Sequence, residues 1–245
     1  MGRDDRVFFW ISIAALVAAF LSALGAAASG LGSRAGLWGF RTGFLILRAA
    51  SIGGLVSGAI AIAALIKVRG DRIAYLLSLV ALVIGLTVFY IPWSWQRAAR
   101  ALPPIHDITT DPVDPPAFTS VLKLRDGAPN PTEYGGKDIA EQQRQAYPDI
   151  TPVVLPLPFN KAFDRALDSA KRMGWEIVAA DKEAGRIEAT DTTFWYGFKD
   201  DVAVRLRNIS EKETRVDVRS VSRVGKSDVG TNARRIREYT AMLEA

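Results

Sequence analysis

The sequence predicts an α+β protein in which three transmembrane helices precede a soluble domain of one helix, a four-stranded antiparallel sheet and a second helix. Three observations support this prediction. The first hundred residues hold three long apolar segments, 11 of the 12 prolines lie within residues 103–158, and helix and strand periodicities fill the remainder. We therefore expect a membrane region at 1–100, an extended proline-rich connector that packs on the domain at 101–158, and an α+β domain at 159–245.

The three predicted spans cover about residues 7–28, 43–66 and 73–92. Each is close to the roughly 20 apolar residues that cross the hydrocarbon layer as a helix. In the second span, Gly54 and Gly58 have a spacing that lets helices approach closely. Tryptophan and arginine residues after the third span are typical of a membrane exit.

Charge is unevenly divided along the chain. Residues 1–100 contain 10 Lys and Arg against 3 Asp and Glu, whereas residues 101–245 contain 21 against 23. The excess of positive charge thus flanks the apolar spans, which indicates the lipid bilayer as a partner and argues against nucleic acid.

The side of the membrane is predicted from one loop. The basic residues divide equally between the two sides, but the short loop KVRGDR (67–72) concentrates three of them. Short basic loops are retained in the cytoplasm. We therefore expect a multi-pass membrane protein whose carboxy-terminal domain lies outside the cytoplasm.

The absence of cysteine excludes disulfides, thiolate catalysis and cysteine-based metal sites. We expect no cofactor and no metal. The only histidine, His106, precedes Asp107 in the connector. This pair could be a general base with its orienting carboxylate, or His106 could be a hydrogen-bonded structural residue. The dense X-Pro pairs around it require extended or turned backbone, and KDIAEQQRQAY further on predicts a short helix.

Two helices bracket the predicted sheet. Asn160 is suited to cap the first helix, and Gly174 is suited to end it in the left-handed conformation. The last helix is expected to begin at about Thr231.

Four strands are expected between these helices, at about 175–180, 186–196, 201–207 and 215–223. In the third of them, Val202, Val204 and Leu206 alternate with polar residues and should face the core. The connections are short, so the strands should form an antiparallel meander.

The stretch SRVGKSDVGTNARRIREY (222–239) carries the candidate site. Ser227 or Asp228 can accept amide hydrogen bonds from the first turn of the helix that follows. Cations in the first turn of a helix oppose its dipole, so the arginines there need nearby anions. The anion could be a bound phosphate or carboxylate, or it could come from the domain's own acids. The candidate residues of this cluster are Arg219, Arg223, Lys226, Asp228, Asn232, Arg234 and Arg235.

Several separated motifs in this half of the chain carry a family resemblance. They are RIEATDTTFWYGFKDDVAVRLR, RVDVRSVSRVGKSDVGTNARRI, the GW pair at 174–175, IHDITTDP and YPDI. Together they resemble the bacterial and plastid family known as domain of unknown function 1499, over about residues 101–245. Three amino-terminal spans also resemble some of its members. The resemblance implies domain boundaries and, together with the basic loop, a bacterial inner (plasma) membrane with the carboxy-terminal domain in the periplasm. It implies no activity, cofactor or catalytic residues.

Two functions are considered from these residues. We favour a binding or scaffolding module at the cell-envelope membrane, whose partner is a lipid headgroup, an envelope polymer or a protein. The alternative is a membrane-associated hydrolase or transferase that uses His106 with carboxylates such as Asp200 and Asp201. Enzyme function is less favoured, because the sequence lacks the nucleophile elbow, the phosphate-binding loop and the dinucleotide fingerprint.

Overall fold

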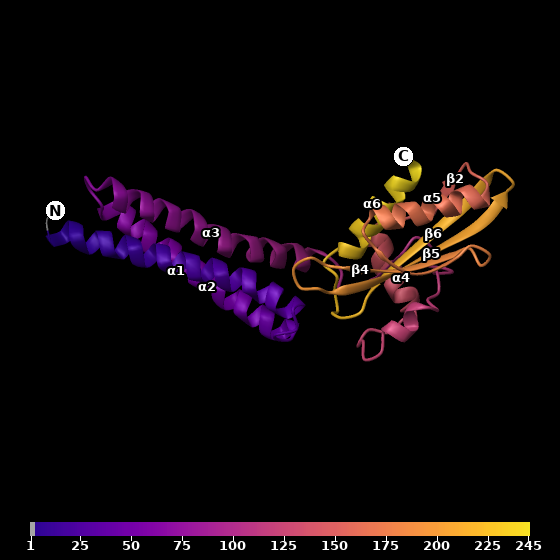
Figure 1. Cartoon of the computed structure of the whole chain (residues 1–245), viewed down its shortest axis with the longest axis horizontal. Helices are drawn as coiled ribbons and strands as arrows, with labels where there is room; N and C mark the ends of the chain where they lie inside the picture. The colour runs from indigo at the N-terminus through magenta and orange to yellow at the C-terminus, as the bar shows by residue number, and fades with distance from the viewer. Residues whose placement is uncertain (1–2) are drawn as a thin grey trace. The chain divides into compact units, whose positions relative to one another are not determined.

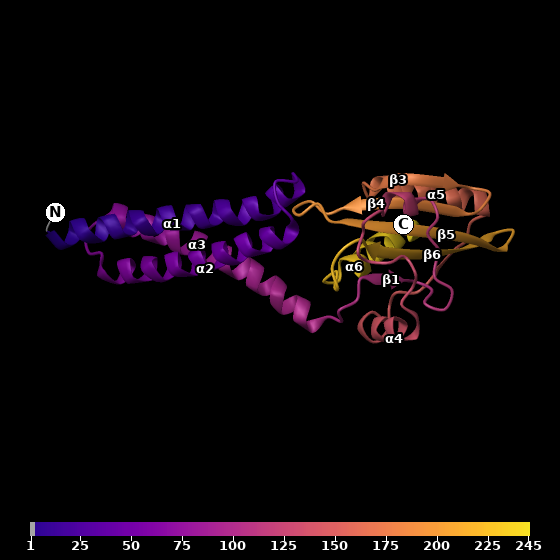
Figure 2. The ribbon, with the colours of Figure 1, turned by 90° about the horizontal axis from the view of Figure 1, so that it is seen from below.

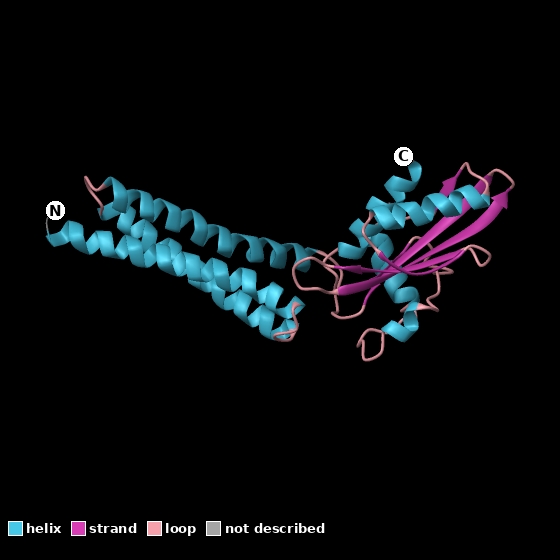
Figure 3. Cartoon of the chain, viewed as in Figure 1, coloured by secondary structure: helices cyan, strands magenta, loops and turns pink. Residues whose placement is uncertain are grey.

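A computed structural model describes residues 3–245, and the chain divides into two compact units. The helical unit comprises the described residues up to 98 together with residues 194–197. The α+β unit comprises residues 99–193 and 198–245 and holds the whole sheet, drawn in magenta in Figure 3. Three long apolar helices are thus followed by a mixed helix and antiparallel-sheet domain, as predicted.

The helical unit is built from α1 (Arg3–Arg34), α2 (Phe40–Lys67) and α3 (Arg72–Ala101). All three helices are long and apolar enough to cross a membrane. Each extends beyond its predicted apolar span, because hydropathy marks only the part at lipid depth, whereas helical hydrogen bonding continues into the polar flanks.

Pro92 lies inside α3 and does not end it. Proline has no N–H group, so the carbonyl four residues earlier loses its helical donor. That carbonyl belongs to Val88, and the hydroxyl of Ser51 in α2 donates to it at 3.2 Å. The neighbouring helix therefore satisfies the freed group, which makes a proline tolerable within an apolar helix.

Small residues determine how closely the helices pack. A Cβ atom added to Gly85 in α3 would lie 2.5 Å from the carbonyl oxygen of Gly54 in α2. Ser57 of α2 is buried and donates to the carbonyl of Ala15 in α1 at 2.8 Å. The Gly54 end of the predicted small-residue spacing thus serves a contact within the chain.

The α+β unit contains the predicted antiparallel meander, with register pairs such as Val204 with Val218. Its strands are β3 (Glu176–Asp181), β4 (Arg186–Thr192), β5 (Lys199–Ser210) and β6 (Glu213–Ser222). β4 ends four residues earlier than predicted, because residues 193–198 turn the chain into β5.

The connector adds two short strands to this sheet, β1 (Asp107–Thr109) and β2 (Val153–Leu155), and both pair with β6. The resulting order is β1-β6-β5-β4-β3, and Figure 2 shows β3 and β1 on opposite sides of β4–β6. The connector also forms the short 3₁₀ helix η1 (Val121–Leu124) and α4 (Gly136–Ala146). α4 is the predicted short helix.

The hydrophobic core lies between the sheet and two helices, α5 (Phe159–Arg172) and α6 (Thr231–Glu244). Figure 1 shows both helices on one face of the sheet. The predicted inward residues of β5 are buried in this core. Trp175 stacks on Tyr239 with ring centroids 4.8 Å apart, and the Tyr239 hydroxyl donates to the carbonyl of Ala166.

The two predicted ends of α5 have different outcomes. Gly174 has φ 77°, so the left-handed end is confirmed. The capping role of Asn160 is wrong, because α5 begins at Phe159 and Pro158 occupies the cap position. Proline fixes φ at the cap position, the helix begins at the next residue, and Asn160 therefore lies inside the first turn rather than at its cap.

Replacing Gly85 by alanine should weaken the contact between α2 and α3. The added methyl group would overlap the Gly54 carbonyl, at a cost of about 1–3 kcal/mol. We expect a lower midpoint of thermal unfolding for the detergent-solubilised protein. Gly39→Ala is the matched control, because a Cβ at Gly39 meets no atom within 4 Å. Equal midpoints for the two variants would contradict the close packing.

Candidate functional site

The sheet of the α+β unit has a charged face on the side opposite α5 and α6. It arises because residues of β4, β5 and β6 alternate with the buried core residues. Residues 111–134 of the connector, here called the covering segment, lie against this face and bury much of it. The charged residues of this face include Glu188, Asp201, Arg205, Arg207, Arg215, Asp217, Arg219 and Arg223.

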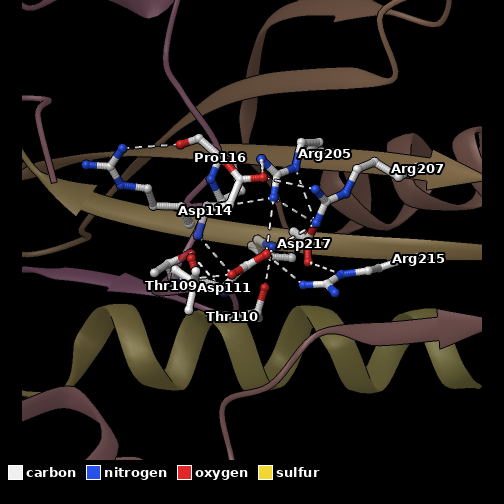
Figure 4. Close-up of polar contacts among 12 residues, drawn as sticks. Thr109, Thr110, Asp111, Asp114, Pro116, Arg205, Arg207, Arg215 and Asp217 are labelled. Atoms are coloured by element: carbon white, nitrogen blue, oxygen red, sulfur yellow. Dashed lines mark hydrogen bonds and ion pairs between the residues drawn. The ribbon is translucent and has the colours of Figure 1, made fainter. Parts of the chain in front are cut away.

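One cluster gathers three arginines around two aspartates (Figure 4). Asp217 is fully buried and accepts from Arg205 at 3.0 Å, Arg207 at 2.8 Å and Arg215 at 2.8 Å. Asp111, from the covering segment, accepts from Arg215 at 2.7 Å. Burial alone would raise the pKa of Asp111, but backbone amides and the charge of Arg215 outweigh it and lower the pKa.

Arg219 forms a two-pronged pair with Asp107 at the edge strand β1. Its Nε and Nη2 atoms lie 2.9 and 2.7 Å from the two carboxylate oxygens. The same guanidinium donates to the carbonyl of Pro116 and lies over the rings of Phe118 and Tyr134, 5.1 and 5.6 Å from their centroids. Arg219 therefore joins β6 to the connector by charge, hydrogen bond and ring contact at once.

Asp201 has two arginine partners on the same face. Arg223 donates to both of its oxygens at 2.9 and 2.8 Å, and Arg125 of the covering segment donates at 2.5 Å. Thr190 adds a hydroxyl at 2.8 Å. Burial would raise the pKa of Asp201, but the hydrogen bonds from Arg223, Thr190 and Arg125 outweigh burial and lower the pKa.

Glu188 is balanced mainly by backbone amides. It is fully buried, and the amides of Thr119, Ser120 and Val121 donate to it at 2.9–3.1 Å. The Thr119 hydroxyl also donates at 2.5 Å. These amides open η1, so the carboxylate satisfies the free N–H groups at the start of a short helix.

Arg235 of α6 lies on the other side of the sheet. It is buried, and it donates to Asp191 at 2.7 Å, Asp200 at 2.6 Å and the hydroxyl of Ser220 at 2.9 Å. It also donates to the side-chain oxygen of Asn232. The side-chain nitrogen of Asn232 in turn donates to the backbone carbonyl of His106, just before β1. This second cluster fastens the first turn of α6 to the ends of the strands.

Of the two residues expected to accept amide hydrogen bonds at the start of α6, Asp228 does so, whereas the hydroxyl of Ser227 accepts from the amide of Val229 in the loop. The Asp228 carboxylate accepts from the amides of Gly230 at 3.0 Å and Asn232 at 2.6 Å. Burial raises the pKa of this carboxyl group. Lys226 and Arg234 are exposed on either side of it. Only these two cations of the predicted cluster face outward.

The structure therefore divides the predicted site residues into separate groups. Arg219 and Arg223 lie on the charged face, while Arg235 lies on the helix side, so the sheet separates residues close in sequence. Asp200 and Asp201 likewise point to opposite faces, because neighbouring residues of a strand alternate.

The sequence reasoning missed the partners supplied by the covering segment, Asp111, Asp114 and Arg125, and their partners Arg205 and Arg207. The signal available was the acids of TDPVDPP beside the alternating arginines of β5.

The paired residues leave little for acid–base chemistry. His106 uses its backbone carbonyl, which accepts from the Ser222 amide at 3.0 Å, while its imidazole has no carboxylate partner among the side chains described at residues 6–245. The neighbouring Asp107 is held by Arg219. The described residues include no group of three or more His, Asp or Glu side chains that could hold a metal ion.

Comparison with known proteins gives one family. The family described as "Protein of unknown function (DUF1499)" matches residues 107–243, which is more than half of the chain. A search of curated proteins finds no match.

Replacing Arg235 by alanine should destabilise the α+β unit strongly. The change leaves Asp200 and Asp191 without their shared cation, at a cost of about 3–5 kcal/mol. Amide hydrogen exchange in β5 and β6 of the full-length protein should become faster. The neighbouring Arg234→Ala is the control and should change stability by less than about 0.5 kcal/mol, because its side chain is exposed. Equal effects would show that the buried pairs contribute nothing.

The α+β unit should lose stability in acid. The pKa values of Asp201 and Asp111 are lowered in the folded state, so their stabilising contribution is present above the ordinary aspartate pKa and is lost as the pH falls through the lowered values. We expect the free energy of unfolding to fall below about pH 4. Asp201→Asn should be less stable at neutral pH and should show a smaller loss in acid. An unchanged pH dependence would contradict this role.

Proposed function

We propose that this protein, which belongs to the DUF1499 family, is a membrane-anchored binding module that presents its α+β unit at the cell-envelope membrane. The observation that carries the proposal is the division of charge in that unit. Its buried ions bind one another, while Lys226 and Arg234 remain exposed around the start of α6. Such a surface suits recognition of an anion better than it suits a chemical step.

The buried clusters support binding over catalysis. A hydrolase or transferase that uses carboxylates needs an acid free to exchange protons near its substrate. Arg235 holds Asp200 and Arg223 holds Asp201, with the guanidinium groups at hydrogen-bond distance. Lowering the pKa of Asp201 keeps it ionised at neutral pH and favours a structural anion.

The exposed loop has the chemistry of an anion-recognition surface. Lys226 lies in the loop, and the nearest carboxylate to Arg234 is Glu238, at 3.9 Å and itself exposed. Val229, also exposed, adopts φ 53°, which a β-branched residue rarely does. We infer that the ligand carries a phosphate or carboxylate, as lipid headgroups and envelope polymers do.

The location is also part of the proposal. The three apolar helices supply bilayer contact, and the basic loop at residues 67–72 favours the cytoplasm for that end of the helices. With three spans, the α+β unit would then lie outside the cytoplasm, in the periplasm of a bacterial cell.

The proposal is tested by native mass spectrometry of the gently solubilised full-length protein. We expect a copurified anionic molecule, and we expect the double variant Lys226→Glu, Arg234→Glu to lose most of that signal while it unfolds at the original temperature. The control variant, Lys161→Glu with Lys212→Glu, makes the same charge change at exposed positions elsewhere in the unit and should keep the bound molecule. A protein without any bound molecule, or equal loss in both variants, would refute an anion site at this loop.

A further inference from the structure

Residues 194–197, between β4 and β5, form part of the helical unit and pack among its helices. The indole nitrogen of Trp195 donates to the carbonyl of Ala27 at 3.2 Å. The hydroxyl of Tyr196 lies 3.2 Å from that of Ser29, within hydrogen-bond distance. Three neighbouring residues of this segment, Phe194 to Tyr196, are aromatic.

Glycines in the helices make the room that these rings fill. A Cβ atom added to Gly30 would lie 2.3 Å from the Trp195 indole ring. One added to Gly43 would lie 2.5 Å from the carbonyl of Ser29 and 3.0 Å from the Tyr196 ring. The rings are therefore seated against helix backbone, in places where any side chain would exclude them.

The seated rings contact further aromatic side chains of the helical unit. The Trp195 ring meets Trp95 of α3 edge to face, with centroids 5.4 Å apart, and the Tyr196 ring lies 4.9 Å from that of Phe44 in α2. Trp38, between α1 and α2, donates to the Ser29 carbonyl at 3.1 Å. We define the aromatic belt as Trp38, Phe44, Trp95, Phe194, Trp195 and Tyr196.

The belt has the composition of a membrane–water interface. Tryptophan and tyrosine gather at headgroup depth, because their rings are apolar while their N–H and O–H groups need polar partners. Arginine accompanies them: the Arg34 guanidinium lies 5.7 Å from the centroid of the Phe194 ring. Leu37, in the turn between α1 and α2, and Leu45, in α2, are further exposed apolar side chains of the helical unit.

Phe194 is the most exposed residue of the belt. Its side chain is 81% exposed, although a phenylalanine gains by leaving water. We propose that Phe194 inserts into the headgroup region of the bilayer, so that the β4–β5 connection makes a direct lipid contact of its own. The occupant is lipid because the exposed ring belongs to a unit of helices apolar enough to cross a membrane and lies beside a cation suited to lipid phosphates. This contact is separate from the anion site proposed at the loop before α6.

The cysteine-free sequence permits a direct test, since a single introduced cysteine is the only labelling site. Phe194→Cys is labelled with the environment-sensitive fluorophore NBD, and the full-length protein is reconstituted into vesicles of mixed phosphatidylethanolamine and phosphatidylglycerol. We expect NBD emission shifted to the blue and severalfold quenching by lipids that carry a nitroxide near the headgroup.

Two labelled controls define the scale. Val113→Cys, at a position 95% exposed in the α+β unit, should emit as in water and resist quenching. Leu45→Cys, at a position 66% exposed in α2, should be quenched by nitroxide lipids. Thermal unfolding must match the unlabelled protein for each variant.

Two outcomes would overturn the proposal. Water-like emission at position 194 without quenching would show that the ring does not reach lipid. Blue-shifted emission that resists nitroxide lipids and fades on dilution of the protein in the membrane would assign the contact to a second copy of the chain.

Discussion

The burial of a charged sheet face is the constraint on which the α+β unit depends. Alternation along β5 and β6 gives the sheet one apolar face for α5 and α6 and one face rich in arginine and aspartate. Ions removed from water without partners are costly, so the segment that covers them must bring opposite charge and amides. The covering segment brings Asp111, Arg125 and the amides that bind Glu188. Its prolines suit this task, because they prevent a continuous helix and leave backbone polar groups free for the sheet.

Local periodicity accounts for the parts of the fold that the sequence predicts well. Val202, Val204 and Leu206 alternate in a way that only a half-buried strand explains, and Gly174 marks a helix end through its own conformational freedom. The short strands β1 and β2 have no such signal. Each has three residues and exists because β6, far along the chain, offers it hydrogen bonds. Tertiary pairing decides their structure, so reading the connector alone predicts only extended chain.

The candidate site was predictable in its residue types but not in its pairs. Several arginines and several acids stand close in sequence, and each arginine has more than one plausible partner. The fold determines which acids and arginines pair, because it places Arg219 on one side of the sheet and Arg235 on the other. A similar choice appears among the apolar helices, where Ser51 satisfies the carbonyl that Pro92 leaves free. In both units, a buried charge or an unpaired carbonyl is satisfied by a polar group from another part of the sequence.

The pairing of β1 with β6 has a consequence for biosynthesis. In register, Asp107 faces Val221, and the covering segment follows directly after β1. Translation therefore releases the covering segment before the strand it needs, so its acids and Arg125 stay hydrated until β6 has been made. Contacts this distant in sequence slow folding, because the intervening chain must be ordered first. The charged face of the sheet therefore stays uncovered until β6 has been made, and a chain that stops before β6 has three apolar helices followed by an unfolded domain.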